Sequence, residues 1–341
     1  MQNRPGEVEP SASTRPEIPV GVGPAADTPT YAVIDSGTTR TRLRIWRGSR
    51  VVWEAERRVG AARTASEGSG PLTLALTELL GAARQHATLG ALGAVIASGM
   101  ITSNVGLFEV PHVPAPASYQ ALAAGICRRE LAGLGEIFFI PGVKTLPVGG
   151  ASGRYGDVLR GEEVEVVGLR ELLGLHGEAA FVHYGSHHKL IRTDDQHLLG
   201  SLTTLGGELL GAVLDHTILA SGTAALNSLG EIDPDWWDRG WAACEQSGFA
   251  RAAFSGRLAG QLLGAAPEQV TAFLLGAASQ QDACLLEGSA PLVLYGHASF
   301  TGPVEGWLRR QGRAVQVVGP EMSERAAALG AVRLFERSPY A

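Results

Sequence analysis

Two short turns in the sequence place glycine beside hydroxyl and charged side chains, the groups that bind phosphate. The first, Asp35-Ser-Gly-Thr-Thr39, follows the apolar residues 31–34 and precedes a run in which apolar and arginine residues alternate. This pattern predicts a strand, a turn and a second strand. Gly37 lets the backbone approach a phosphate, while Thr38 and Thr39 supply amides and hydroxyls that donate to it. An ordinary hairpin turn explains the isolated motif equally well.

The carboxylate of Asp35 has a clear role if the turn binds a triphosphate. It can hold Mg²⁺ directly or through water, and the metal neutralises charge that develops on the transferred phosphoryl group. The turn therefore predicts ATP and Mg²⁺ as ligands, with Asp35 as the metal ligand.

A second turn of the same kind lies in the second half of the chain. Gly185, Ser186 and His187 follow the apolar residues 180–182, so their amides and hydroxyl can meet the terminal phosphate from the opposite side. His187 and His188 do not predict a zinc site, because successive strand residues point to opposite faces and no third ligand lies at a recognisable spacing. The two turns together predict a phosphate clamp.

Two adjacent acids, Glu162 and Glu163, follow Gly161 at the start of a segment with helical periodicity that runs to about residue 173. Carboxylates at a helix start are ordinarily solvated caps. Alternatively, one of them accepts the proton of the attacking hydroxyl in phosphoryl transfer. Consecutive helical residues are about 100° apart around the axis, so we expect one of the pair to face the ligand.

The rest of the chain predicts strands and helices in two related halves. Apolar runs predict strands at residues 31–34, 41–45, 51–53, 94–97, 137–140, 180–182, 189–192, 292–295 and 314–318. Helical periodicity predicts helices at 72–86, 118–134 and 323–335, and mostly helix over 205–287. Residues 1–28 are rich in Pro, Glu, Ser and Gly and predict a flexible tail. We expect an N-terminal lobe over 29–160 and a C-terminal lobe over 161–341.

Composition narrows the partners to small molecules. The chain has 341 residues and a net charge of −6 without a Lys/Arg run, which argues against binding nucleic acid or an acidic membrane surface. Three widely spaced cysteines, Cys127, Cys244 and Cys284, read as reduced thiols. The sequence shows neither a signal-peptide pattern nor an apolar run long enough to span a membrane. We therefore expect a cytoplasmic protein; its oligomeric state stays open, a homodimer included.

Six motifs occur in one order along residues 30–335. They are the first turn with Arg42, Ser98-Gly-Met-x-x-Ser-Asn-Val-Gly106, Arg160-Gly-Glu-Glu163, Gly185-Ser-His-x-Lys189, Gly207-Glu208-Leu and Gly296-x-Ala-Ser299. Together they resemble the 2-dehydro-3-deoxygalactonokinase family. The resemblance implies an α/β, two-lobed actin/hexokinase-like (ribonuclease H-like) fold with a central cleft. It also implies ATP-dependent phosphorylation of 2-dehydro-3-deoxy-D-galactonate at its 6-hydroxyl, in galactonate breakdown.

The resemblance assigns roles to individual residues. Nucleotide binding falls on the two phosphate motifs, Arg42 and an adenosine motif formed by Gly296, Ala298 and Ser299. The base falls on Glu162 or Glu163, and the glycine–acid arrangement of related sugar kinases favours Glu162, which directly follows Gly161. The sugar-acid site falls on Ser98, Gly99, Met100, Ser103, Asn104, Lys189 and Glu208. Lys189 or Arg42 would meet the substrate carboxylate or the phosphates.

Two positions depart from the family pattern: Ser36 stands where tryptophan is common, and Tyr184 where proline is common. Ser36 lies beside the phosphates, so nucleotide affinity or substrate range would differ. A sugar-acid sensor with weak catalysis, a kinase for a related keto-deoxy acid, and a phosphatase or nucleotidase of the superfamily remain alternatives. Retention of Asp35 and both glutamates favours the enzyme. The sequence does not distinguish the galactonate-derived from the gluconate-derived epimer.

Overall fold

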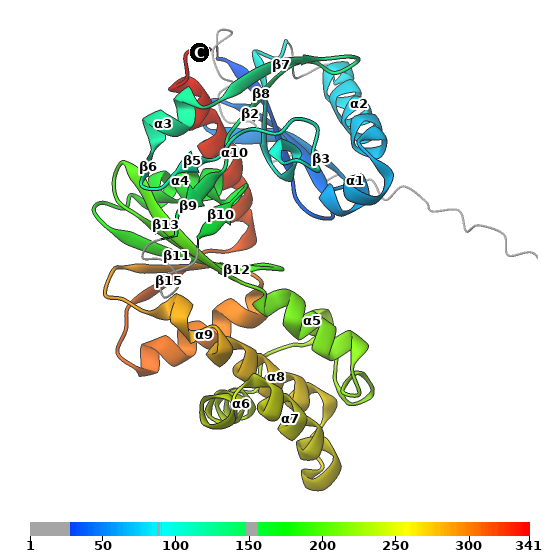
Figure 1. Ribbon diagram of the computed structural model, residues 1–341, viewed down its shortest axis with the longest axis vertical. Coiled ribbons are helices and arrows are strands. Elements are labelled where there is room, and N and C mark those ends of the chain that lie inside the picture. The colour runs from blue at the N-terminus through cyan, green and yellow to red at the C-terminus, as the bar shows by residue number, and fades with distance from the viewer. Residues whose placement is uncertain (1–27, 87–88, 90, 148–155) are drawn as a thin grey trace, which may run out of the picture.

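A computed structural model describes residues 28–86, 89, 91–147 and 156–341 of the protein (Figure 1). The predicted flexible tail, residues 1–28, lies outside the described residues except for its last position. Two six-stranded sheets and a small three-stranded sheet organise the chain. Helices α1 and α2 accompany the first large sheet, and helices α5–α9 lie beyond the second (Figure 1).

The first large sheet has the strand order β3-β2-β1-β4-β8-β7. Strands β1, β2 and β3 form an antiparallel meander, and β4 and then β8 continue the sheet parallel to β1. Apolar side chains of α2 pack with inward-facing residues of these strands in one core cluster. The bounds are β1 Thr30–Ser36, β2 Thr41–Arg47, β3 Arg50–Arg57, α1 Ala61–Glu67, α2 Gly70–Gln85, β4 Ala94–Gly99, β7 Cys127–Leu131 and β8 Gly135–Phe139.

The second large sheet repeats this topology, with the order β15-β14-β11-β12-β13-β6. Strands β11, β12 and β13 form the meander, and β14 and then β15 continue it parallel to β11. The bounds are β6 Ala117–Ser118, β11 Ala179–Tyr184, β12 His188–Thr193, β13 His197–Thr204, β14 Leu292–Gly296 and β15 Val315–Val317. The repeated unit confirms the predicted α/β fold built from two related halves.

Helices α4 (Glu162–Leu173) and α10 (Pro320–Glu336) cross between the two sheets (Figure 1). Their backbones touch at two glycines. A Cβ on Gly168 would lie 1.9 Å from the Ala326 carbonyl oxygen, and a Cβ on Gly330 would lie 1.8 Å from that of Val164. Glycine is therefore required at both positions, and the crossing fixes where α4 begins.

The predicted lobe boundary at residue 160 stays a prediction. The strands of the first large sheet precede residue 160, and those of the second follow it, except β6. Contacts also cross this boundary: β6 pairs with β13 of the second sheet, and α10 contacts β1 and β4 of the first. A three-stranded sheet between the halves has the order β10-β9-β5, with β5 at Val113–Pro114, β9 at Val143–Thr145 and β10 at Asp157–Leu159.

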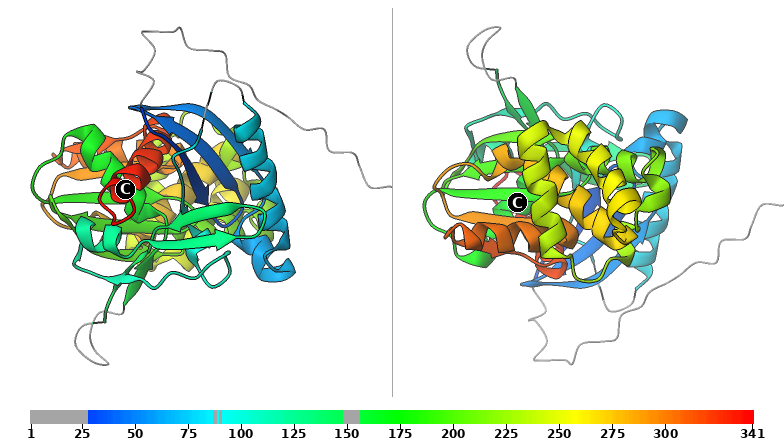
Figure 2. Two further views of the ribbon diagram at one scale, coloured as in Figure 1. Left: turned by 90° about the horizontal axis from the view of Figure 1, so that it is seen from above. Right: turned by 90° about the horizontal axis from the view of Figure 1, so that it is seen from below.

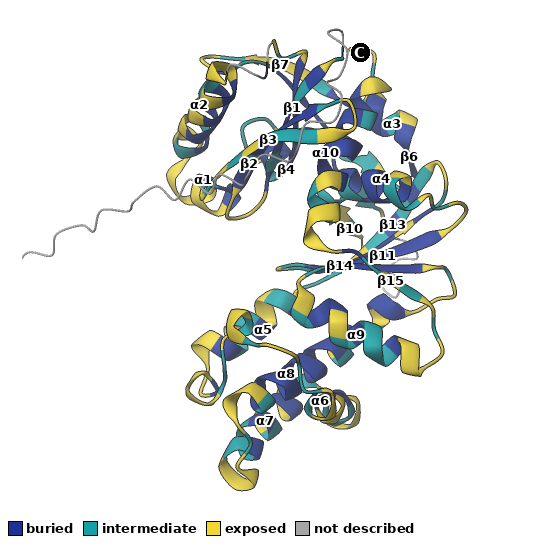
Figure 3. Cartoon of the chain, turned by 180° about the vertical axis from the view of Figure 1, so that it is seen from behind, coloured by how far each residue is buried: buried dark blue, intermediate teal, exposed yellow. Residues whose placement is uncertain are grey.

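Helices dominate the chain after β13, as predicted. They are α5 Gly206–His216, α6 Pro234–Ser247, α7 Phe249–Leu263, α8 Pro267–Gln281 and α9 Ala298–Arg310. Buried residues concentrate on the strands and on the inward faces of these helices, and α7 exposes much of its surface (Figure 3). Within the described ranges no single helix is long and apolar enough to cross a membrane; only α5 with Ala220–Ser228 passes that test, as a pair bent by 81°.

The prediction of helix over residues 118–134 was wrong beyond its first turn and a half. Helix α3 covers Tyr119–Ala124, and β7 then forms a hairpin with β8. Gly133 makes this turn possible with a φ of +78°. Pairing with the sheet therefore overrides the local helical tendency of the Arg- and Leu-containing segment.

Candidate active site

The turn predicted to bind phosphate first, residues 37–40 (hereafter the first phosphate turn), joins β1 to β2. It is closed by a 2.9 Å hydrogen bond from the Gly37 amide to the Arg40 carbonyl. The carbonyls of Gly37 and Thr38 accept hydrogen bonds of 3.1 and 2.9 Å from the first amides of α1. Gly60 permits this contact, because a Cβ there would lie 2.6 Å from both oxygens. All four turn residues are exposed. The protein thus engages the carbonyls of the turn and leaves its outer side to a ligand.

Asp35, the next-to-last residue of β1, lies beside a pocket of about 320 Å³. The pocket is lined by Asp35, Gly37, Thr39, Arg40 and Arg42, which unites most of the predicted first phosphate site. The Asp35 side chain is 29% exposed, and its Oδ2 lies 3.8 Å from Nη1 of the buried Arg44. Arg42 donates a 3.0 Å hydrogen bond to Glu56.

These residues fit a magnesium ion bound with nucleotide. Mg²⁺ is commonly held by one or two carboxylates together with substrate phosphates. In the part of the chain that the structure describes, no three His, Cys, Asp or Glu side chains are grouped to hold a metal. Asp35 would therefore hold Mg²⁺ jointly with phosphate oxygens rather than within an all-protein site.

The second phosphate turn, residues 185–187, joins β11 to β12 and is supported in the same way. The amide of Glu208, in the first turn of α5, donates a 2.8 Å hydrogen bond to the Ser186 carbonyl. A Cβ on Gly207 would lie 2.1 Å from the Gly185 carbonyl oxygen. Figure 1 shows α1 and α5 on the same side of the molecule, one for each sheet. Views from above and below agree (Figure 2).

The two histidines after Ser186 face different surroundings, as the strand alternation predicts. His187 is partly exposed, with Nε2 3.4 Å from Oε1 of Glu208. His188 is buried, with Nδ1 2.6 Å from Oδ2 of the buried Asp282. Glu208, predicted in the sugar-acid site, thus lies at the second phosphate turn.

The predicted adenosine motif begins where β14 ends, beside the second turn. Gly296 pairs with Tyr184 in the parallel ladder and has a φ of +105°. A Cβ there would lie 2.3 Å from the Tyr184 carbonyl oxygen, which accepts a 2.8 Å hydrogen bond from the His297 amide. His297 then caps α9 by accepting from the Ser299 amide at 3.3 Å. The second phosphate motif and the adenosine motif are therefore neighbours at one sheet edge.

The predicted substrate loop, residues 98–104, begins with the last two residues of β4 and lies against the start of α4. A Cβ on Gly99 would lie 2.5 Å from the Ser36 carbonyl oxygen, and one on Gly161 would lie 3.3 Å from the Gly99 Cα. Ser98 and Ser103 are buried, and the Ser103 hydroxyl donates to the Met100 carbonyl at 2.7 Å. Met100 is half-buried and Asn104 exposed, so these two side chains have the freest access to a ligand.

Arg160 ties this loop to α4. Its guanidinium lies 2.6 Å from the Thr102 hydroxyl, donates to the Val110 carbonyl at 3.1 Å, and lies 3.0 Å from Nε2 of His112. Burial and the charge of Arg160 lower the pKa of His112. Arg160 therefore orders the loop around the acids that follow it.

Glu162 and Glu163 have different environments. Oε1 of Glu162 lies 2.8 Å from Nζ of Lys189, and the two side chains are 15% and 10% exposed. Burial acts to raise the pKa of Glu162, but the charge and hydrogen bond of Lys189 help to hold that pKa below its ordinary value. Glu163 is fully buried and accepts hydrogen bonds of 2.9 and 2.8 Å from the Gly161 amide. Burial and the Glu162 charge raise the pKa of Glu163 to about 8.

Three further side chains surround this pair and were missed from the sequence. Burial and the charge of Asp35 raise the pKa of Glu165 well above its ordinary value. Burial lowers the pKa of His183 to about 4, and its ring stacks on Tyr295 at 4.7 Å. Burial and the Glu165 charge raise the pKa of Tyr295, although neither its hydroxyl nor Oε2 of Glu165 makes a hydrogen bond of normal geometry. The spacing of Glu162 and Glu165 on one helix face was the available signal.

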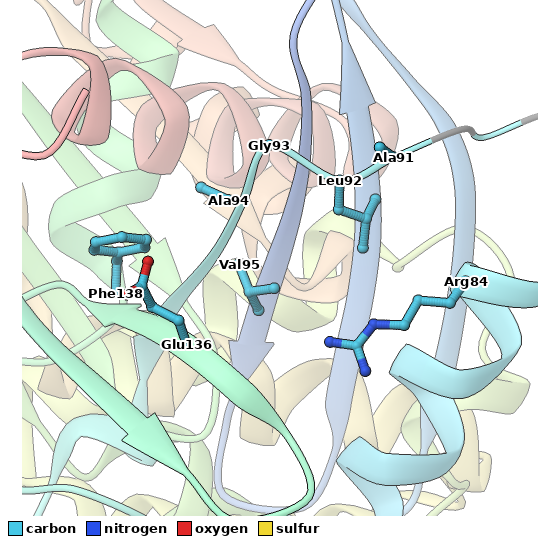
Figure 4. A pocket seen from close by; sticks show the side chains of 8 residues that line it. All are labelled: Arg84, Ala91, Leu92, Gly93, Ala94, Val95, Glu136 and Phe138. Carbon is cyan, nitrogen blue, oxygen red and sulfur yellow. The ribbon is translucent and has the colours of Figure 1, made fainter.

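A pocket on the first sheet lies away from all these residues. It has a volume of about 310 Å³ and is lined near the start of β4 by Arg84, Leu92, Val95, Glu136 and Phe138, among others (Figure 4). None of the predicted site residues lines it.

Comparison with known proteins supports the kinase family that the six sequence motifs resemble. Residues 35–333 match the family model described as 2-keto-3-deoxy-galactonokinase. The chain is 27% identical over 193 residues to 2-dehydro-3-deoxygalactonokinase of Escherichia coli (strain K12), covering 56% of this chain and 59% of that protein. It is 31% identical over 199 residues to probable 2-dehydro-3-deoxygalactonokinase DgoK1 of Rhizobium meliloti (strain 1021), covering 57% and 59%. The alignments thus span less than two thirds of these relatives.

A crystal structure extends the similarity over the fold. It comes from Sinorhizobium meliloti and is provisionally named a 2-dehydro-3-deoxygalactonokinase. The superposition has a TM-score of 0.71 at 25% identity and covers 89% of this chain and 98% of that chain.

Proposed function

Because the chain belongs to the 2-keto-3-deoxy-galactonokinase family, we propose that it transfers the terminal phosphoryl group of ATP to the 6-hydroxyl of 2-dehydro-3-deoxy-D-galactonate. This reaction would serve galactonate breakdown. Family membership supports a sugar-acid kinase, and the choice of acid and hydroxyl is the proposal.

One observation carries the proposal: each sheet presents a glycine turn of the same design, and α4 begins between the sheets with a semi-buried carboxylate. The carbonyls of both turns bond to helix amides, so their outer amides and hydroxyls remain for phosphates. Kinases need such positioning more than covalent chemistry, because phosphoryl transfer depends mainly on alignment and charge stabilisation.

We assign Glu162 as the base. At neutral pH its carboxylate is ionised, since its pKa lies below the ordinary value. Glu163, with a pKa of about 8, is mostly protonated at that pH and has no exposed surface. Glu162 is thus the acid of the pair that can accept a proton from a bound hydroxyl.

The reaction then proceeds without a covalent enzyme intermediate. The substrate oxygen attacks the terminal phosphorus, its proton passes to Glu162, and the bond from that phosphorus to the bridging oxygen breaks with its electrons leaving on ADP. Residues 37–39 and 185–187 orient the phosphates on either side. Mg²⁺ bound at Asp35 would neutralise charge on the phosphate oxygens.

A coupled assay of ADP release tests the proposal. The panel should contain 2-dehydro-3-deoxygalactonate, its gluconate-derived epimer, and galactonate itself as the non-dehydrated control. We expect turnover to be fastest with the first acid, and to be lost in Glu162→Gln. Faster turnover of the epimer would reassign the substrate. Tight binding of the acids without ADP release would favour a sensor instead.

A further inference from the structure

Lys189 is one of the few lysines in a chain whose basic residues are mostly arginine. The sequence contains 28 lysines and arginines, of which two, Lys144 and Lys189, are lysines. Lys189 lies on β12, two positions after His187 of the second phosphate turn, and its ammonium is paired with Glu162 at 2.8 Å. An ammonium is a compact charge on a flexible stem, so it exchanges partners more readily than the rigid fork of arginine.

The surroundings of this ion pair are held neutral. On α4, the raised pKa values of Glu163 and Glu165 favour their protonated forms. From β11, His183 is neutral at pH 7 because its pKa is lowered to about 4. From β14, the pKa of Tyr295 is raised. Among the described ionisable groups that face Glu162, Lys189 therefore contributes most to compensating its charge, ahead of His183.

This pairing conflicts with the role of Glu162 as a base. A general base works best when its pKa lies near the operating pH. Lys189 helps to hold the pKa of Glu162 below its ordinary value, whereas burial alone would raise it. Removing the ammonium would leave the semi-buried carboxylate with the Arg160 amide, which donates to its Oε2 at 3.2 Å, but without a paired cation. Its affinity for a proton would rise.

The second phosphate turn offers Lys189 an alternative partner. Two residues along a strand span about 7 Å, and an extended lysine places its ammonium about 6 Å from Cα, given bonds of about 1.5 Å. A phosphate held at residues 185–187 is therefore within reach. The carboxylate of the substrate is not a suitable partner while Lys189 remains near Glu162, because carbon 1 and the 6-hydroxyl of an extended six-carbon chain are about 7 Å apart.

We propose that Lys189 is a switch residue that leaves Glu162 for the terminal phosphate when ATP binds, so that Glu162 becomes a base once the phosphoryl donor is in place. The inference rests on the proposed function, because it requires a triphosphate at the second turn. In the transfer step, the hydroxyl proton moves to Glu162 while the phosphorus–oxygen bond to ADP breaks. Lys189 stays charged and stabilises the phosphoryl oxygens.

The two lysines make a direct test practicable. Protein labelled with ¹³C at the lysine ε carbon gives two signals, which Lys144→Arg assigns. In the free protein we expect the Lys189 signal to titrate at acid pH with Glu162, and to lose this step in Glu162→Gln. Saturating AMP-PNP with Mg²⁺ should move the Lys189 signal and abolish the step. ADP, which lacks the terminal phosphate, should leave the signal in place.

The pH dependence of catalysis gives a second readout. In the parent enzyme the acidic limb of kcat, which reports the bound complex, should lie at least about one pH unit above that of kcat/KM for ATP. In Lys189→Met the two limbs should coincide at the higher pH. A lysine that stays paired with Glu162 in the bound complex would instead make the two limbs of the parent coincide at the lower pH, and Lys189→Met would then raise both limbs together.

The outcomes separate this inference from the proposed function. If calorimetry shows that AMP-PNP does not bind, both are overturned. If AMP-PNP binds and the Lys189 signal does not move, the switch is overturned while an ATP-dependent kinase still stands. If ADP moves the Lys189 signal as far as AMP-PNP does, Lys189 contacts an inner phosphate. The proposed contact with the transferred terminal phosphate is then overturned. Movement with AMP-PNP alone, together with the limb shift, establishes the switch.

Discussion

Replacing Gly168 by alanine should destabilise the protein although alanine is the better helix former. The added Cβ would lie 1.9 Å from the Ala326 carbonyl oxygen, whereas ordinary contact begins at 3.4 Å. The obstructing atoms belong to the backbone of α10, so the two helices must separate by about 1.5 Å. Overpacking of this kind costs about 1–3 kcal/mol or more, against a helix-propensity gain of about 1 kcal/mol. Because the obstructing atoms are backbone, we take the upper end of this cost, about 3 kcal/mol, which leaves a net loss of about 2 kcal/mol.

A matched control isolates this steric term. Gly81 lies inside α2 with nothing within 4 Å of an added Cβ, so Gly81→Ala should stabilise by up to about 1 kcal/mol. Urea unfolding of both variants, compared with the parent, measures the difference. Gly330→Ala should resemble Gly168→Ala, and the double variant should cost less than the sum, because the helices separate once. Equal stability of the Gly168 and Gly81 variants would refute the packing argument.

Four further predictions concern the site. Asp35→Asn should remove most Mg²⁺-dependent turnover with an unchanged circular dichroism spectrum; activity within a few-fold of the parent would exclude its metal role. Glu162→Gln should lower kcat by about 10²-fold or more with little change in nucleotide affinity, while Glu163→Gln stays active; the reverse pattern moves the base by one residue. The pKa of Glu163 is raised from 4.5 to about 8, so this residue contributes stability that is fully present below pH 4.5 and is lost as pH rises through 8. The free energy of unfolding of Glu163→Gln should therefore depend less steeply on pH between these values than that of the parent. Parallel pH curves for the two proteins would contradict the assignment. Asp282→Ala should lower stability by about 3 kcal/mol by leaving the buried His188 without its partner, and a loss below about 0.5 kcal/mol in urea unfolding would contradict this.

The sequence was informative about the fold because both halves carry the same local pattern. An apolar run, a glycine turn and a second strand are short-range features, and each of these was found where it was predicted. Residues 127–131 were predicted as helix from their local propensity. They form a strand because they pair with β8, and local propensity does not reveal that partner. Local sequence patterns do not predict where a helix ends and a strand begins when strand pairing decides it.

In the candidate site, too, local sequence patterns predicted some features, while others depend on tertiary structure. The turn residues could be proposed from the sequence because phosphate binding requires glycine and hydroxyl groups that lie close together along the chain, and this role stays a prediction. The neutral surroundings of Glu162 were missed, since His183 and Tyr295 come from different strands and meet only through the parallel pairing of β11 and β14. Their ionisation depends on burial, which a single residue type does not report.

The packing of α10 against the first sheet has a consequence during synthesis. Strand β1 leaves the ribosome early, but the helix that contacts it begins at Pro320. At about 5–20 residues per second, the intervening chain takes roughly 15–60 s to make. One apolar face of the first sheet is without its covering helix for that interval. Chaperone contact and aggregation should therefore depend on translation speed, and a chain truncated before Pro320 should expose this face permanently.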